Sequence, residues 1–175
     1  MSAQFPAGIR AAQAVGLTGA AWLAGNIFGY SFVSIPSLLN SHREYQAPIA
    51  LILKQWRDMY NAGHRQNPPI AAISAAAFGY LAWAVPHSTA GEVLAPTNAA
   101  ALYSTAAALT AAMVPWTFVA MMQTNRLLLD RAAATWVPTE KSSEDVEGLL
   151  GKWSVLNMVR GVFPLVGAVV GSFAA

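Results

Sequence analysis

Cysteine is absent from this chain of 175 residues. Without a thiol the protein has no disulfide bond, no cysteine-ligated zinc, no iron–sulfur cluster and no thiol redox centre. The absence also argues against the small helical membrane proteins that pass electrons from thiols to quinones, because those proteins need paired cysteines.

Charge is scarce as well: charged residues make up 10% of the chain, against about 25% in ordinary soluble domains. Hydrophobic residues make up 55%, and the net charge is +2. So few charges cannot cover a water-facing surface, so we expect a lipid bilayer to cover much of it. The scattered basic residues form no stripe interleaved with aromatic side chains, which argues against a nucleic-acid partner.

Strong catalytic motifs are missing too. The sequence contains no Ser-His-Asp grouping, no HExxH and no phosphate-binding loop. Its histidines, His42, His64 and His87, are too few and too scattered to predict a metal site. A haem would need an axial ligand inside a membrane span, and no histidine falls there.

Four apolar segments have about the length that a membrane-spanning helix needs. They run over about residues 11–39, 69–85, 98–122 and 153–173. The sequence therefore predicts a single all-α domain over residues 1–175, an integral membrane four-helix bundle. Gly167 and Gly171 form a small-xxx-small pair suited to close helix packing. The acid-rich "PTEKSSEDVEG" is expected to be a flexible loop.

Between the first two spans, residues 47–63 predict an additional amphipathic helix at the interface. Its apolar positions recur at helical spacing and include Trp56 and Tyr60. Gly63 is a plausible stop, and Pro68-Pro69 is expected to end the helix before the second span. An interfacial anchor accounts for this pattern without any chemistry, because Trp and Tyr collect at membrane interfaces.

A second polar cluster favours a functional interpretation. Trp153, Asn157 and Arg160 are spaced to share one face at the start of the fourth span, and Asn125 ends the third span at a similar depth. Ionisable residues in spans are candidates for function. The alternatives are an Arg160 that extends to the interface and an Asn125 that only caps a helix end.

Several short motifs in order resemble the DUF1772 family, and within it the fungal anthrone oxygenases of polyketide pathways. They are "SIPSLL", "LKQWRDMYNAGH", "NPPIAAIS", "QTNRLLL" and "WSVLNMVRG". The resemblance implies oxidation of an anthrone to an anthraquinone with O2, without metal, flavin or haem. It also implies a multi-pass protein of a eukaryotic endomembrane.

The resemblance also suggests roles for the clustered residues. A histidine, with an ordinary pKa of about 6.5, is a reasonable general base, and His64 or His42 fits. Asn157 and Arg160 would hold the developing oxyanion. The substrate-binding residues would be Trp56, Tyr60, Asn125 and Trp153. The alternative is a non-enzymatic tetraspan protein, a transporter or scaffold for hydrophobic metabolites.

The distribution of basic residues predicts the orientation in the membrane. With four spans, nine of the ten Lys and Arg residues lie on or near one side, and only Arg10 lies opposite. The positive-inside rule then places both termini away from the cytosol.

We expect a C-terminal tag to be protected from a protease added to the cytosolic side of intact vesicles. A tag that is cleaved there would contradict the orientation but not the bundle.

Overall fold

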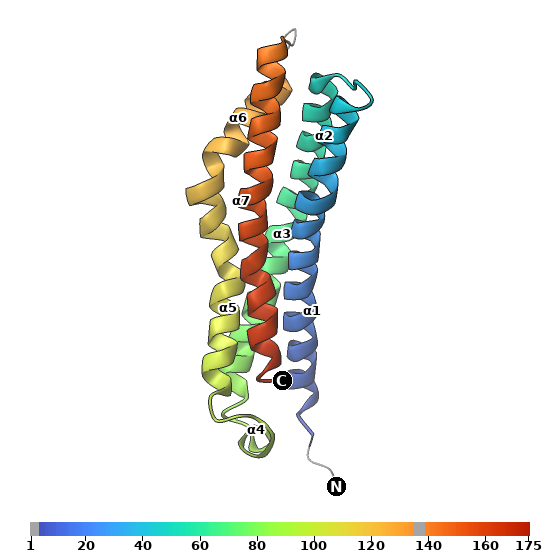
Figure 1. Ribbon diagram of the computed structural model, residues 1–175. Helices are drawn as coiled ribbons and strands as arrows, with labels where there is room; N and C mark the ends of the chain where they lie inside the picture. Colours follow the sequence, from blue (N-terminus) through green and yellow to red (C-terminus); the bar gives the residue numbers. More distant parts are fainter. Residues whose placement is uncertain (1–3, 135–138) are drawn as a thin grey trace. The chain divides into compact units, whose positions relative to one another are not determined.

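The computed structural model describes residues 4–134 and 139–175, and this part of the chain contains helices and no strands (Figure 1). The prediction of an all-α fold is therefore confirmed. The helices are α1 (Ala7–Gly29), η1 (Tyr30–Ser34), α2 (Ile35–Arg43), α3 (Ile49–Ala84), α4 (Thr89–Leu94), α5 (Ala99–Trp116), η2 (Thr117–Met121), α6 (Met122–Ala133) and α7 (Glu140–Ser172).

Two of these elements are short π-helical segments inside longer helices. η1 joins α1 to α2, and the N–H of Ile35 donates to the carbonyl of Tyr30, five residues earlier. η2 joins α5 to α6, so that Ala99–Ala133 forms one helix of 35 residues. Single π turns inside α-helices are rare and are frequent at functional sites.

The predicted break between the amphipathic helix and the second span is wrong. α3 runs without interruption from Ile49 to Ala84 and contains both Pro68 and Pro69. A proline inside a helix costs about 3 kcal/mol, because it has no N–H and its ring meets the carbonyl four residues earlier. Packing offsets that cost here, since Trp56 before the prolines and Phe78 after them are both fully buried.

The expected flexible loop is helical over most of its length. Pro138 lies outside the described residues, but α7 already begins at Glu140. Thr139 caps this helix: its Oγ1 accepts from the N–H of Ser142, and the Ser142 hydroxyl accepts from the N–H of Thr139. Reciprocal capping of this kind satisfies the free N–H groups of the first turn. It explains why an acidic stretch forms a helix.

The chain divides into two compact units. The first comprises the chain up to Gly25 together with Asn67–Val114 and Gly161–Ala175. The second comprises Asn26–Gln66 and Pro115–Arg160. Each unit has its own hydrophobic core.

The core of the first unit packs around Phe78 and Tyr103. A Cβ added at Gly171 would lie 2.7 Å from a ring carbon of Phe78, and one at Gly167 would lie 2.8 Å from Oγ1 of Thr110. Close packing at this glycine pair is thus confirmed. The amide of Gln13 donates to the Tyr103 hydroxyl, which donates to the Ala174 carbonyl and ties down the C-terminal end.

The core of the second unit is built on two tryptophans, Trp56 of α3 and Trp153 of α7, whose rings meet edge to face at 5.7 Å. Ile35, Met121 and Leu150 pack in the same cluster. These side chains come from α2, α3, η2 and α7, so the core brings together parts of the sequence far apart.

Within residues 4–134 and 139–175, two helices are long and apolar enough to cross a membrane, Ala99–Ala133 and Ser142–Ser172. Large apolar side chains point outward on both π-helical segments: Val33 is 64% exposed and Val119 is 87% exposed. The helical segments of the first two predicted spans, α1 to α2 and the second half of α3, do not meet the same criterion.

Candidate active site

A small cavity in the second unit gathers most of the polar and aromatic residues that the sequence singled out. Its volume is about 20 Å³, which is room for about one water molecule. It is lined by Tyr30, Tyr60, Gly63, His64, Thr117, Trp153 and Arg160.

α3 contributes three of these residues from one face. Tyr60, Gly63 and His64 stand at positions i, i+3 and i+4, which are neighbours on a helix surface. The ring of Tyr60 stacks on His64 at 5.8 Å and on Trp56 at 5.2 Å. His64 is exposed at the outer end of this stack, and Trp56 is fully buried at the inner end. Trp56 therefore lies behind Tyr60 and does not line the cavity.

Arg160 is the cation of the site, and its charge has an unusual environment. Its guanidinium donates to Oδ1 of Asn157 at 2.7 Å and, in a long hydrogen bond of 3.4 Å, to Oγ1 of Thr117. Both acceptors are neutral. Its Nε is buried and has no hydrogen-bond partner among the described residues. Within this part of the chain, Arg160 also forms no salt bridge with a carboxylate.

Asn157 holds Arg160 from behind and is completely buried. Its Nδ2 donates to the carbonyl of Ile27 at 2.9 Å and to the hydroxyl of Ser31 at 2.9 Å. An asparagine amide has two donor hydrogens, so both are used inside the protein. Asn157 thus links α7 to η1 and the turn before it, and it presents its oxygen to Arg160.

Trp153 is held in a similar way. Its Nε1 donates to Oδ1 of Asn125 at 2.9 Å, and both side chains are buried. Because a buried indole N–H needs an acceptor, Asn125 fixes the orientation of the ring that lines the cavity. Asn125 itself does not line it.

The two π-helical segments supply two of the three lining residues that sequence reasoning missed, and the third is Gly63 of α3. Tyr30 is the first residue of η1, and Thr117 is the first residue of η2. A π turn shifts the backbone hydrogen-bond pattern by one residue, and α7 side chains bind carbonyls of this region: Ser154 donates to Ser31 and Asn157 to Ile27. Helical periodicity in the sequence does not reveal such a shift.

The predicted site residues therefore fall into two layers. Those that line the cavity are Tyr60, His64, Trp153 and Arg160. Those that contact this layer from behind are Trp56, Asn125 and Asn157. Ser31, Trp116 and Ser154 add hydrogen bonds between the helices around them.

The second histidine considered as a base lies elsewhere. His42 Nδ1 is 2.7 Å from the carbonyl of Ala47, and its Nε2 is 3.7 Å from a carboxylate oxygen of Glu147, which also pairs with Arg43. These contacts tie the end of α2 to α7. His42 is not among the residues that line the cavity.

Tyr60 is protonated in this site. Burial raises the pKa of its hydroxyl above the ordinary value of about 10, and the nearby Arg160 cation offsets part of that rise. Tyr60 precedes the second predicted span, and its hydroxyl is neutral near pH 7, so it can donate a hydrogen bond.

In residues 4–134 and 139–175, no three His, Asp or Glu side chains gather to hold a metal ion.

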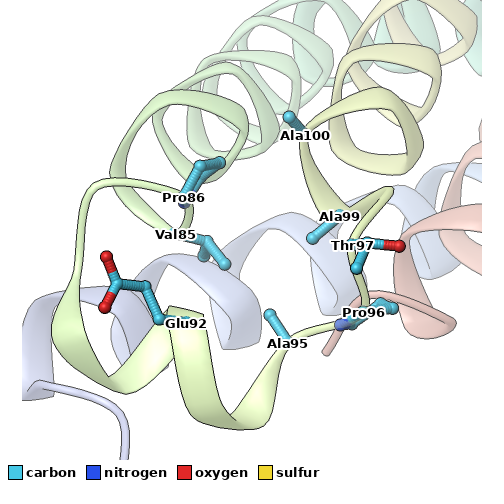
Figure 2. A pocket seen from close by; sticks show the side chains of 9 residues that line it. Val85, Pro86, Glu92, Ala95, Pro96, Thr97, Ala99 and Ala100 are labelled. Carbon is cyan, nitrogen blue, oxygen red and sulfur yellow. The ribbon is translucent and has the colours of Figure 1, made fainter.

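A second hollow lies in the first unit, beside the turn around α4 (Figure 2). Its lining consists of small apolar residues with Thr97 and Glu92. Gly91 packs so closely there that an added Cβ would overlap the carbonyl of Val85. The hollow has no aromatic lining residue among those described, so it does not resemble a site for a flat organic ligand.

Comparison with known proteins identifies the family of this chain. The family model described as anthrone oxygenase matches residues 56–170, which include all the cavity residues except Tyr30. This chain belongs to the anthrone oxygenase family. The prediction from the short motifs is confirmed.

Individual relatives match over nearly the whole chain. Anthrone oxygenase encC of Aspergillus fumigatus is 38% identical over 92% of this chain and 90% of its own length. Anthrone oxygenase AgnL2 of Paecilomyces divaricatus is 32% identical over 92% of this chain and 93% of its own. The noranthrone monooxygenase of Aspergillus flavus is 35% identical over 89% of this chain and 68% of its own.

No solved structure matches the chain. The names of the relatives are those of oxygenases. Family membership therefore disfavours the alternative of a non-enzymatic scaffold or transporter.

The hydrogen bonds of Asn157 predict its contribution to stability. Asn157→Ala removes the hydrogen bonds of Asn157 to the Ile27 carbonyl, the Ser31 hydroxyl and the Arg160 guanidinium, so we expect the free energy of unfolding to fall by about 1–3 kcal/mol. Denaturant unfolding in detergent measures the change. Ser154→Ala, which removes one partly buried hydrogen bond, should cost less. Equal stability of Asn157→Ala and the wild type would contradict the assignment.

Proposed function

We propose that this chain oxidises an anthrone to the corresponding anthraquinone with molecular oxygen, in the biosynthesis of an aromatic polyketide. Family membership supports the reaction type. One observation in the site carries the proposal further: the guanidinium of Arg160 lines the cavity, and among the described residues it has no carboxylate partner.

The chemistry of the substrate limits what the protein must do. An anthrone has an acidic CH2 group between two aryl rings, and loss of a proton gives an electron-rich anthranolate. The anion donates an electron to O2, and a bond forms between that carbon and oxygen. One oxygen atom becomes the new carbonyl and the other leaves as water. The protein then has to bind the rings, remove the proton and stabilise the oxyanion.

Arg160 is proposed to bind the oxyanion. A guanidinium has five N–H donors, and two acceptors are provided by Thr117 and Asn157. A buried charge is costly unless it is paired, and a substrate oxygen that gains negative charge would provide the missing partner. Hydrogen bonds to ionised groups are about twice as strong as neutral ones.

Asn157 is proposed to position Arg160. The sequence suggested Asn157 as a second oxyanion donor, but both of its amide hydrogens donate to Ile27 and Ser31. Its oxygen accepts from Arg160 and orients the guanidinium. Loss of this contact would act on the substrate through Arg160.

His64 is proposed as the general base. It lines the cavity at the exposed end of the stack with Tyr60, where a proton can leave to solvent. His42 is engaged with Ala47 and Glu147 and lies off the cavity, which favours His64 between the two.

Tyr60 and Trp153 are proposed to bind the flat rings through their aromatic faces, with Trp56 and Asn125 holding them in place from behind. At about 20 Å³ the cavity has room for a water molecule but not for three fused rings. Binding therefore requires the lining side chains to move, and His64, the exposed member, is the one freest to do so.

We also propose that the chain is an integral membrane four-helix bundle with spans near residues 11–39, 69–85, 98–122 and 153–173. Two helices meet the length and hydropathy of a span, and the low charge of the whole chain supports the others. An apolar tricyclic substrate would reach such an enzyme from the lipid.

The proposal is tested by mixing an anthrone anaerobically with membranes that contain the protein and then adding O2. Anthraquinone absorbance should appear faster than in control membranes. We expect Arg160→Ala to lower kcat/KM by about 100-fold or more, the effect of losing an oxyanion donor. Arg160→Lys should lose less, because it keeps the charge but not the planar fork.

Arg126→Ala is the matched control for the loss of a positive charge. Arg126 is exposed on α6 and does not line the cavity, so this variant should turn over normally. If Arg160→Ala and Arg126→Ala are equally active while folded, the oxyanion site is not at Arg160.

The assignment of the base predicts a change in pH dependence. We expect His64→Ala to lower turnover by about 100- to 10,000-fold. The wild-type rate should decline when acidification protonates the base, and the variant should lack that decline. His42→Ala should keep both the rate and the pH profile. The opposite result for the two histidines would move the base to His42.

A further inference from the structure

Gly63 occupies a position inside a helix where glycine is unfavourable. It lies inside α3, with Tyr60 three residues before it and His64 next to it, and it is buried against the cavity. Glycine is among the least favourable residues in a helix interior, because it loses the most backbone freedom on folding.

The backbone gives no reason for a glycine at this position. No described glycine has a positive φ, so an L-residue can adopt the conformation of residue 63. The helix continues to Ala84, which excludes the helix stop that the sequence suggested. Two reasons remain: close packing of a neighbouring segment, or space beside the cavity that a side chain would fill.

The position of that space follows from the helix geometry. Residues 60, 63 and 64 lie on one side of α3, and a Cβ at residue 63 would project beside Tyr60, on the flank away from His64. The cavity of about 20 Å³ lies there, beside Arg160. A methyl group is about the size of the water molecule that this cavity can accommodate.

We propose that Gly63 determines substrate specificity: its missing side chain leaves room for the edge of the substrate's ring system next to Arg160. This inference rests on the proposed function. It assigns to the site a ligand whose flat rings pass close to the α3 backbone and whose ring substituents meet residue 63. Alanine at this position would exclude substituted rings more strongly than bare ones.

The test compares Gly63→Ala with Gly151→Ala in the intact protein. Gly151 lies in α7, and an added Cβ there would meet nothing within 4 Å. Both substitutions should raise the unfolding temperature by about 2–4 °C, because alanine favours the helix. Gly151→Ala should keep wild-type kinetics.

Gly63→Ala should lower kcat/KM for a methyl- and hydroxyl-substituted anthrone by about 10- to 200-fold, the usual effect of one methyl group in a pocket. The loss should appear mainly in KM, and it should be smaller for unsubstituted anthrone. Quenching of tryptophan fluorescence by the anthraquinone product measures binding without turnover and should show a similar loss of affinity.

Three outcomes decide the matter. Wild-type KM and wild-type anthraquinone affinity in Gly63→Ala would overturn the inference and leave the proposed function intact. A Gly63→Ala protein less stable than the wild type would also overturn it, because the glycine would then serve packing alone. If the wild type binds anthraquinone but oxidises no anthrone, the proposed function fails, and the binding data still decide the role of Gly63.

Discussion

The second unit must accommodate a partly buried arginine whose hydrogen-bond partners among the described residues are all neutral. Arg160 donates to Thr117 and Asn157, and Asn157 is held in turn by the Ile27 carbonyl and Ser31. In a chain with 10% charged residues, a buried charge without an anion is expensive. Hydrogen bonds of Asn157 and Arg160 link α7 to the end of α1, to η1 and to η2, and Arg160 also lines the cavity.

Helix irregularities accompany every segment that lines the cavity. η1 and η2 are π-helical where they meet it. His64 stands four residues before Pro68, and Arg160 four before Pro164, and a proline has no N–H to donate to the carbonyl four residues earlier. Regular helices present side chains at fixed angles. These departures change which side chains face inward, and the site residues lie beside them.

Much of the fold was predictable from the sequence because helical periodicity and apolar length are local properties. The all-α class, the glycine contact at Gly171 and the inward face of Trp56 and Trp153 followed from spacing. The break at Pro68 was predicted and is absent, because packing on both sides of the prolines outweighs their local preference. The acidic stretch after Thr139 also formed a helix, and its cap between Thr139 and Ser142 is a local feature that the sequence analysis did not use.

For the site, the sequence by itself determined the residue types: one arginine in an apolar run, an asparagine and a tryptophan on the same helix face, and an aromatic pair ahead of a histidine. It also determined the family, through short motifs in a fixed order. Only the tertiary structure decided which of these residues line the cavity and which contact the lining residues from behind. It placed Tyr60 and Arg160 on the cavity and Trp56 behind it, and it added Tyr30 and Thr117 through π turns. The physical reason is that a side chain's partners depend on contacts between segments far apart in the chain.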